Sequence, residues 1–463
     1  MLARKSLLLF ATHLVNSLLG FASTFIVARL MGPEILGIIG YLLGLAGLVA
    51  LFSDLGFSVA HVKRVSEQDD VAENIGAFFV LKGGLTVIVT LVLYLAPVVA
   101  DWVGYRPLTT PEHYLAYYLL ASIYLFRGLG TLFNATFRAR QETAKTSVSL
   151  IVSSFATAVA KIAVAVAGLG LVALSSTYLL ESAVLFGVAL LLFRGYPVKR
   201  PRWAHLRRYV IFALPVMLTF VLANLIANID RVMLGEFWDV TEVGYYLGVA
   251  GILRIMEQVS SAGMTLFMPQ SSHDAHHGRH AIVVQRLFAA EKYLLLIMVP
   301  ITVLVVFFRE PIVRLVLGNR FLPSIPVLAV LAANALWKTY RRPYGNLAYA
   351  LDKPHYLVWT AAVNLVTLLI ADPILIPNTL FGIPMLGLGS LGAALGWLVK
   401  SLVGGSVLLL LLNRRAQVPI YGRAVWFLAA GGLMYGTMYA LESVLQWNQL
   451  WHVPLLALIG GGV

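Results

Sequence analysis

Long apolar stretches, separated by short polar turns, follow one another along almost the whole chain. Most are 18 residues or longer, enough for an α-helix to cross a membrane hydrocarbon core of about 30 Å. They lack the strict apolar/polar alternation of a membrane β-barrel strand. We therefore expect helical spans at residues 6–30, 35–61, 75–99, 113–138, 144–168, 170–193, 207–235, 243–269, 286–308, 322–351, 355–377, 385–412 and 423–441. A last apolar piece, 451–463, is too short to span alone.

Thirteen spans and a partial fourteenth predict an all-α polytopic membrane protein. The composition agrees, because 60% of the residues are hydrophobic and only 12% are charged, about half the charged fraction of a soluble domain. Cysteine is absent, which excludes disulfides, thiolate chemistry and cysteine metal sites. The first apolar run is too long for the hydrophobic region of a signal peptide, so we expect it to stay as a span.

The distribution of Lys and Arg predicts the orientation of the chain. If the N-terminus is cytoplasmic, nineteen Lys and Arg residues lie in cytoplasmic turns, against four or five on the other side. Such an excess is typical of cytoplasmic loops. We expect a multi-pass protein of the inner, cytoplasmic membrane with its N-terminus inside. The net charge of +13 is then explained by basic loops facing anionic lipid, without a nucleic-acid partner.

Three internal matches indicate a duplicated six-span unit. VARLMGPEILGIIGYLLGLAG (27–47) matches ANIDRVMLGEFWDVTEVGYYLG (227–248), NATFRARQ (134–141) matches NLAYALDK (346–353), and GLVALSSTYLLES (170–182) matches GSLGAALGWLVKS (389–401). Parallel repeats of this kind form two lobes around a cavity. We predict a lobe at 1–193, a basic linker at 194–208, a second lobe at 209–412 and extra C-terminal spans at 413–463.

The segments ARLMGPEILGIIGYLLG (28–44), FSDLGF (52–57) and the stretch from NIDRVMLGEF (228–237) to VGYYLGVAGILRIMEQV (243–259) carry a family resemblance. They are similar to the polysaccharide-transport branch of the multidrug/oligosaccharidyl-lipid/polysaccharide exporter superfamily, in particular to Wzx-type flippases for lipid-linked O-antigen units. The resemblance runs through nearly the whole chain. It implies a flippase that carries a polyprenyl-pyrophosphate-linked oligosaccharide from the inner to the outer leaflet by alternating access. NSLLGFASTF (16–25) lacks the arginines of lipid II flippases, which disfavours a peptidoglycan precursor.

Polar and charged residues within the predicted spans are candidates for binding such a cargo, because ionisable groups inside a membrane usually face a cavity or a partner. A pyrophosphate needs fixed cations, and sugars need amides or hydroxyls. The candidate substrate-binding residues are His13, Asn16, Arg127, Lys161, Asn224, Asn228, Arg254 and Lys400. Two alternatives are local neutralisation of Arg254 by Glu257 and a pair between Glu181 and Lys400. Arg127 and Lys161 could also serve as structural ion pairs.

Four further residues are candidates for gating. Asp230 and Arg231 lie near the outer end of the seventh predicted span, as Arg29 does in the first, and Asp54 lies in the inner half of the second. Asp230 could pair with Arg29 when the outer side closes. The alternative is that these charges anchor and cap helix ends at the membrane interface.

The sequence predicts neither a cofactor nor a metal. In HDAHHGRH (273–280) four histidines could share one helical face, but Gly278 weakens a helix and the segment is a basic loop. The chain has no nucleophile elbow, nucleotide-binding loop or extramembrane domain, so we expect no enzyme. The expected partners are the lipid-linked oligosaccharide, membrane lipids and polysaccharide polymerase or export machinery, with a monomer as the functional form. The alternatives are a multidrug exporter of the same superfamily, a membrane glycosyltransferase or polymerase, and a scaffold.

Overall fold

A computed structural model describes residues 2–445, except 68–69, 263, 265–266, 268–270, 272–273, 276, 278 and 352. The partial span predicted at 451–463 lies outside the described residues, as do His273 and His276. The described helices are α1 (Leu2–Val49), α2 (Phe57–Ser66), α3 (Val71–Trp102), α4 (Pro111–Ala139), α5 (Thr143–Val166), α6 (Leu171–Leu192), α7 (Trp203–Phe237), α8 (Val240–Ala262), α10 (His280–Phe307), α11 (Arg309–Val316), α12 (Ile325–Ala350), α13 (His355–Leu375), α14 (Gly389–Ala416) and α15 (Ala424–Leu445). The described residues also form two short 3-10 helices, η1 (Ala50–Phe52) and η2 (Asn319–Ser324). Two short strands, β1 (Thr379–Leu380) and β2 (Ile383–Pro384), pair antiparallel.

The first helix contains a break that divides it into two crossings. Gly32 has φ 84° and ψ 178° inside α1, directly before Pro33. Such a backbone conformation is readily open only to glycine. An unbroken apolar segment from Ala11 to Phe52 would be 42 residues, or about 63 Å, roughly twice the thickness of the hydrocarbon core. The break therefore separates the two spans that the sequence predicts at 6–30 and 35–61.

Eleven helices of the described residues are long and apolar enough to cross a membrane. The break at Gly32 makes the first of them two crossings, so twelve of the thirteen full spans expected from the hydrophobic pattern have such a helix. The span expected at 243–269 corresponds to α8, a 23-residue helix that is not among the eleven. The pattern placed the second span too far along the chain, because α2 is a separate helix after a turn at residues 53–56. The prediction of an all-α polytopic membrane protein is confirmed.

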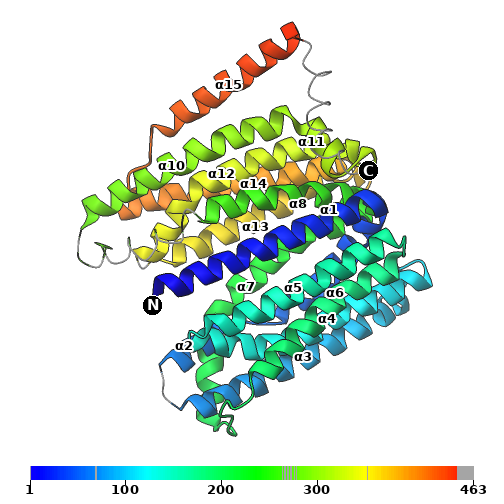
Figure 1. Ribbon diagram of the computed structural model, residues 1–463, viewed down its shortest axis with the longest axis vertical. Coiled ribbons are helices and arrows are strands. Elements are labelled where there is room, and N and C mark those ends of the chain that lie inside the picture. Colours follow the sequence, from blue (N-terminus) through cyan, green and yellow to red (C-terminus); the bar gives the residue numbers. More distant parts are fainter. Residues whose placement is uncertain are drawn as a thin grey trace. The chain divides into compact units, whose positions relative to one another are not determined.

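The chain divides into two compact units. The first comprises Met1–Gly248 and Asp372–Ala393, and the second comprises Val249–Ala371 and Ala394–Val463. In the first unit, α3, α4, α5 and α6 pack side by side (Figure 1). The lobes predicted at 1–193 and 209–412 stay a prediction.

A buried histidine ties four helices of the first unit together. His61 on α2 places Nδ1 3.0 Å from the Tyr209 hydroxyl and Nε2 2.8 Å from the Thr136 hydroxyl. Its ring stacks on Phe78, with centroids 4.0 Å apart. Tyr209 in turn donates to the Asn74 carbonyl at 2.9 Å. These contacts join α2, α3, α4 and α7 at one end of the unit, beside the cavity described below.

In the second unit, a buried cluster forms around Tyr344, where α10, α12 and α14 meet. The Tyr344 hydroxyl donates to Glu291 Oε2 at 3.1 Å and accepts from the Tyr421 amide at 3.0 Å. The indole of Trp337 donates to the Ser401 carbonyl at 2.6 Å, which joins α12 to α14.

Candidate functional site: a basic cavity in the first unit

A cavity of about 970 Å³ lies within the first unit, between α2, α3, α4, α7 and the turn before α2. Its volume is at the upper end of the range for ligand pockets, about 300–1,000 Å³. The lining includes three serines, two threonines, a tyrosine and two asparagines besides its charged side chains. The polar and charged lining residues are Ser53, Asp54, Ser58, Lys63, Ser66, Lys82, Thr86, Tyr124, Arg127, Thr131, Arg138, Asn224 and Asn228.

Helical spacing explains how α4 contributes to this cavity. Tyr124, Arg127, Thr131 and Arg138 are separated by three, four and seven residues, so they share one face of the helix. Arg127 and Arg138 are both exposed, and their separation of eleven positions corresponds to about 16 Å along the helix axis. Arg138 lies one residue before the end of α4 at Ala139. The cavity therefore has one arginine at its loop end and another well inside the span.

A buried ion pair lines the same cavity. The Lys82 ammonium lies 3.0 Å from Asp54 Oδ1 and also donates to the Ser53 carbonyl. Ser58 donates to Asp54 at 2.6 Å. Because Asp54 is the single acid among the lining residues and Lys63, Lys82, Arg127 and Arg138 are bases, the lining carries a net charge of +3. The cavity consequently favours an anionic ligand.

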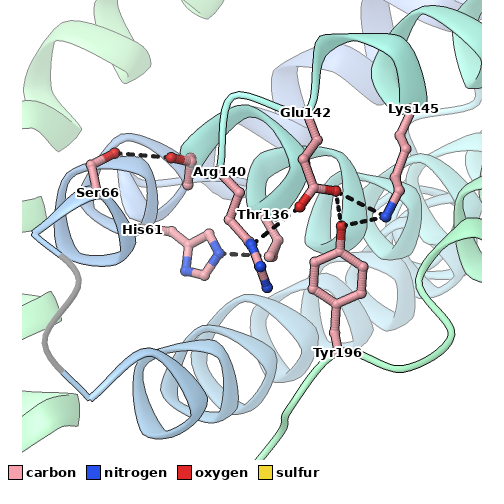
Figure 2. A network of polar contacts seen from close by, with 8 residues as sticks. His61, Ser66, Thr136, Arg140, Glu142, Lys145 and Tyr196 are labelled. Atoms are coloured by element: carbon pink, nitrogen blue, oxygen red, sulfur yellow. Dashed lines mark hydrogen bonds and ion pairs between the residues drawn. The ribbon is translucent and has the colours of Figure 1, made fainter.

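The loop end of the cavity is held by a polar network on α4, α5 and the segment after α6 (Figure 2). Glu142 lies 3.2 Å from Arg140 and 2.9 Å from Lys145. Tyr196 donates to Glu142 and accepts from Lys145, the latter at 2.7 Å. Burial raises the pKa of Glu142, but the hydrogen bond from Tyr196 and the Lys145 and Arg140 cations outweigh it and hold that pKa below its usual range. Glu142 therefore stays charged at neutral pH.

Four of the predicted site residues meet at the cavity. Arg127, Asn224 and Asn228, expected to bind substrate, and Asp54, expected to gate, all line it. The two asparagines lie one turn apart on α7, and their amide groups donate to the Phe220 and Asn224 carbonyls. Their carbonyl oxygens and the second N–H of each amide are therefore left for a ligand's hydroxyls.

The other substrate-binding candidates of the first unit lie elsewhere. Lys161 is buried between α5 and α6, with its ammonium 3.7 Å from the centroid of the Tyr178 ring. This is the geometry of a cation–π contact. His13 and Asn16 lie on the first half of α1, where His13 is exposed and Asn16 is half-buried.

Arg254 and Lys400 belong to the second unit. Arg254 is exposed on α8, whereas Lys400 is buried with its ammonium 3.1 Å from the centroid of the Trp397 ring. Glu257, the neighbour considered as a partner for Arg254, forms an ion pair with Lys338 at 2.9 Å.

The remaining gating candidates lie on the first half of α1 and on the second half of α7. Asp230 is buried and interacts with the hydroxyl of Tyr246 on α8. The side chain of Arg231 packs beside Gly44, and Arg29 is exposed on α1. The proposed pairing of Asp230 with Arg29 stays a prediction.

Three basic residues of the cavity were missed from the sequence. Lys82 lies inside the predicted span 75–99, so its charge within an apolar run was enough to make it a candidate substrate-binding residue. Lys63 and Arg138 were assigned to cytoplasmic turns by the count of basic residues. Only the fold shows that they line the cavity, with the Lys63 ammonium 4.7 Å from the centroid of the Phe212 ring.

One group of side chains in the described residues has the composition of a metal site. Asp70, Glu73 and His205 offer ligand atoms within 4.8 Å of one another. The two ring nitrogens of His205 lie 3.3 Å from Asp70 and 3.2 Å from Glu73, and Arg202 lies 3.6 Å from Glu73. These contacts explain the group as a polar bridge between the starts of α3 and α7.

A family model described as "Polysaccharide biosynthesis protein" matches residues 26–326. The match includes every residue that lines the basic cavity. The chain belongs to this family. The resemblance inferred from the glycine, aspartate and arginine patterns is thereby confirmed.

Individual proteins agree with this assignment. The chain is 22% identical to the "Probable low-salt glycan biosynthesis flippase Agl15" of Haloferax volcanii, over 97% of this chain and 92% of that protein. Its fold matches the "Lipid II flippase MurJ, inward closed conformation" with a TM-score of 0.72 and 14% identity, covering 96% and 99% of the two chains. It also matches an inward-facing multidrug resistance MATE transporter of the MOP superfamily, with a TM-score of 0.67 and 15% identity over 87% and 94%.

Proposed function

We propose that the chain is a flippase that moves a polyprenyl-pyrophosphate-linked oligosaccharide from the inner to the outer leaflet. The observation that carries this proposal is the basic cavity, whose lining has four cations and one carboxylate. A charged lining inside a membrane protein is costly unless it serves a ligand or a pathway. Family membership and the names of the two flippase relatives support a glycan lipid as that ligand.

The chemistry of the cavity fits the two parts of such a headgroup. The guanidinium of Arg127 can hold two phosphate oxygens at once. Lys82 supplies a second cation, but it is already paired with Asp54, so a phosphate that binds Lys82 must compete with that carboxylate. The carbonyl oxygens of Asn224 and Asn228 would accept hydrogen bonds from sugar hydroxyls.

The proposed direction of transport depends on the orientation of the chain. We place the N-terminus and the loop end of the cavity, with Lys63 and Arg138, on the cytoplasmic side. Because the chain has no cysteine, single cysteines at Arg200 and Arg106 would report this directly. A membrane-impermeant maleimide added to intact cells should label position 106 and spare position 200; the reverse pattern would contradict the assignment.

Transport in reconstituted vesicles tests the proposed function. Wild-type protein should move a polyprenyl-pyrophosphate trisaccharide between leaflets, and Arg127→Ala should reduce the rate at least tenfold, because it removes a charge-assisted contact to phosphate. Arg127→Lys should retain part of the activity, since it keeps the charge but not the bidentate geometry.

Arg207→Ala is the matched control, because Arg207 is exposed on α7 but does not line the cavity. It should transport at the wild-type rate. Thermal unfolding of each variant separates loss of function from loss of fold. The proposal fails if the wild type moves no lipid of this class, and in particular if it extrudes organic cations instead.

A further inference from the structure

A second, smaller cavity of about 350 Å³ lies in the first unit, at the opposite ends of α4 and α7 from the basic one. It is formed by the second half of α1, the segment before and at the start of α4, and the turn from α7 to α8. Its polar and aromatic lining residues are Tyr41, Arg106, Thr109, His113, Glu236, Trp238 and Asp239. The volume is large enough for a small ligand.

Glu236, one of the two acids that line this cavity, is held in place by two tyrosines. The hydroxyls of Tyr41 and Tyr105 both donate to Glu236 Oε1. Burial and the hydrogen bond to Glu236 raise the pKa of Tyr105 to about 12, so this hydroxyl remains a donor at neutral pH. Within the described ranges, Glu236 Oε2 accepts no hydrogen bond from protein, and it is left for a ligand.

The neighbouring aromatic ring is also fixed. The indole N–H of Trp238 donates to the Ile376 carbonyl at 2.6 Å, and the side chain remains partly exposed beside the cavity. Because its N–H is engaged, Trp238 can offer a ligand its apolar ring surface. Asp239 accepts from Thr241 at 2.9 Å through Oδ2, which leaves Oδ1 as a second acceptor.

The charge balance of this cavity differs from that of the basic one. The lining carries two carboxylates, Glu236 and Asp239, and one guanidinium, Arg106. His113 and Thr109 are further polar groups of the lining. Two carboxylates disfavour a phosphate, and the guanidinium disfavours a cation. A neutral ligand with many hydroxyls and one apolar face suits this combination of acceptors, donors and a fixed aromatic ring.

We propose that this cavity binds a neutral sugar ring of the cargo's glycan, on the side where the cargo leaves. The inference rests on the proposed function, because it assumes a glycan lipid. Sugar hydroxyls would donate to Glu236 and Asp239, and the ring would lie against Trp238. The basic cavity would thus hold the pyrophosphate and the sugar next to it, while the second cavity recognises a sugar further along the glycan.

A pair of matched lipids tests this division. One is polyprenyl pyrophosphate that carries a trisaccharide of neutral hexoses, and the other is the same polyprenyl pyrophosphate without sugar. Glu236→Gln should lower transport of the glycosylated lipid about tenfold, because it removes a charged acceptor, and should leave transport of the sugar-free lipid unchanged. Arg127→Ala should lower transport of both.

Glu112→Gln is the matched control, since Glu112 is exposed in the first turn of α4 at the same end but does not line the cavity. It should transport both lipids at the wild-type rate. If Glu236→Gln slows both lipids equally, or slows neither, Glu236 and Trp238 only anchor helix ends at the membrane interface, and the proposal is wrong.

Equilibrium binding of the free trisaccharide separates this proposal from the flippase function. Purified wild-type protein should bind the sugar saturably, Glu236→Gln should bind it about tenfold more weakly, and Arg127→Ala should bind it normally. That result would support the sugar cavity even if no lipid were transported. Absence of saturable binding to the wild type, or equal binding by Glu236→Gln and Glu112→Gln, would overturn the proposal.

Discussion

A buried ammonium inside an apolar helix determines how the basic cavity is built. Lys82 is 4% exposed within α3, and a charge in such a place is unfavourable unless it is paired and hydrogen-bonded. Asp54 and the Ser53 carbonyl supply both requirements. The turn before α2 is therefore bound to α3 by a charged contact at the wall of the basic cavity.

Glu142 offers a pH-dependent test of the network that closes this end of the first unit. Glu142→Gln keeps the shape and removes the charge, so at neutral pH the wild type should be more stable by about 0.5–1 kcal/mol, the scale of partly exposed ion pairs. The folded-state pKa of Glu142 is lowered below the ordinary 4.5. This contribution is complete above that ordinary value and is lost as pH falls through the folded-state pKa.

Thermal unfolding of the two proteins in detergent, from neutral pH to below pH 4.5, measures this difference. The difference in melting temperature between wild type and Glu142→Gln should disappear at the lowest pH values of this range. Glu67→Gln is a useful control, because Glu67 is exposed and pairs with Arg64 at 3.1 Å. A gap between wild type and Glu142→Gln that stays constant across the range would contradict the assignment.

Single residues of the cavity differ in how far the sequence could reveal them. Arg127, Asn224, Asn228 and Asp54 stand out because polar side chains are rare within apolar runs, and all four line the cavity. Lys161 stands out in the same way but packs on Tyr178. Hydropathy finds a polar residue within a span, but it does not give the face of the helix bundle on which the residue lies.

At the scale of elements, the second half of α1 packs closely on the end of α7 and the start of α8. A Cβ atom at Gly37 would lie 1.7 Å from the Val240 carbonyl oxygen, and one at Gly244 would lie 1.9 Å from that of Pro33. Both positions belong to the internal repeat identified from the sequence. The matched segments therefore cross each other within the first unit, with backbone against backbone, as small residues permit in membrane helices.

Replacing Gly37 by Ala should consequently force the helices apart. We expect a loss of stability of about 3 kcal/mol, the upper part of the range for overpacking, because the obstacle is backbone rather than a movable side chain. Gly20→Ala in the same helix has nothing within 4 Å of the added Cβ and should cause no loss. Melting temperatures of the two variants check this, and equal values would contradict the close crossing.

Hydrophobic length predicted the long helices well, because crossing a membrane requires about 20 apolar residues. It did not predict elements that are too short to span, such as α2 and the β1–β2 pair. It also assigned α2 to the second span, because residues 53–56 contain no proline to mark the end of that helix. The positive φ of Leu55 and Gly56, at 50° and 82°, turns the chain there.

At the scale of the molecule, family membership and fold agree with the pattern of spans. The chain belongs to the polysaccharide biosynthesis family, and its fold matches transporters over most of their length. Composition established a membrane protein, and motifs indicated the family. The lining of the basic cavity carries an excess of three positive charges, and the proposed cargo rests on this excess.

The central claim is that the basic cavity recognises the pyrophosphate of the cargo. The most direct measurement is the equilibrium binding of two lipids, polyprenyl pyrophosphate and the corresponding polyprenol, to purified wild-type protein and to Arg127→Ala. The wild type should prefer the pyrophosphate lipid by at least tenfold, and Arg127→Ala should lose most of that preference. Equal affinity of the wild type for both lipids, or an undiminished preference in Arg127→Ala, would contradict the account.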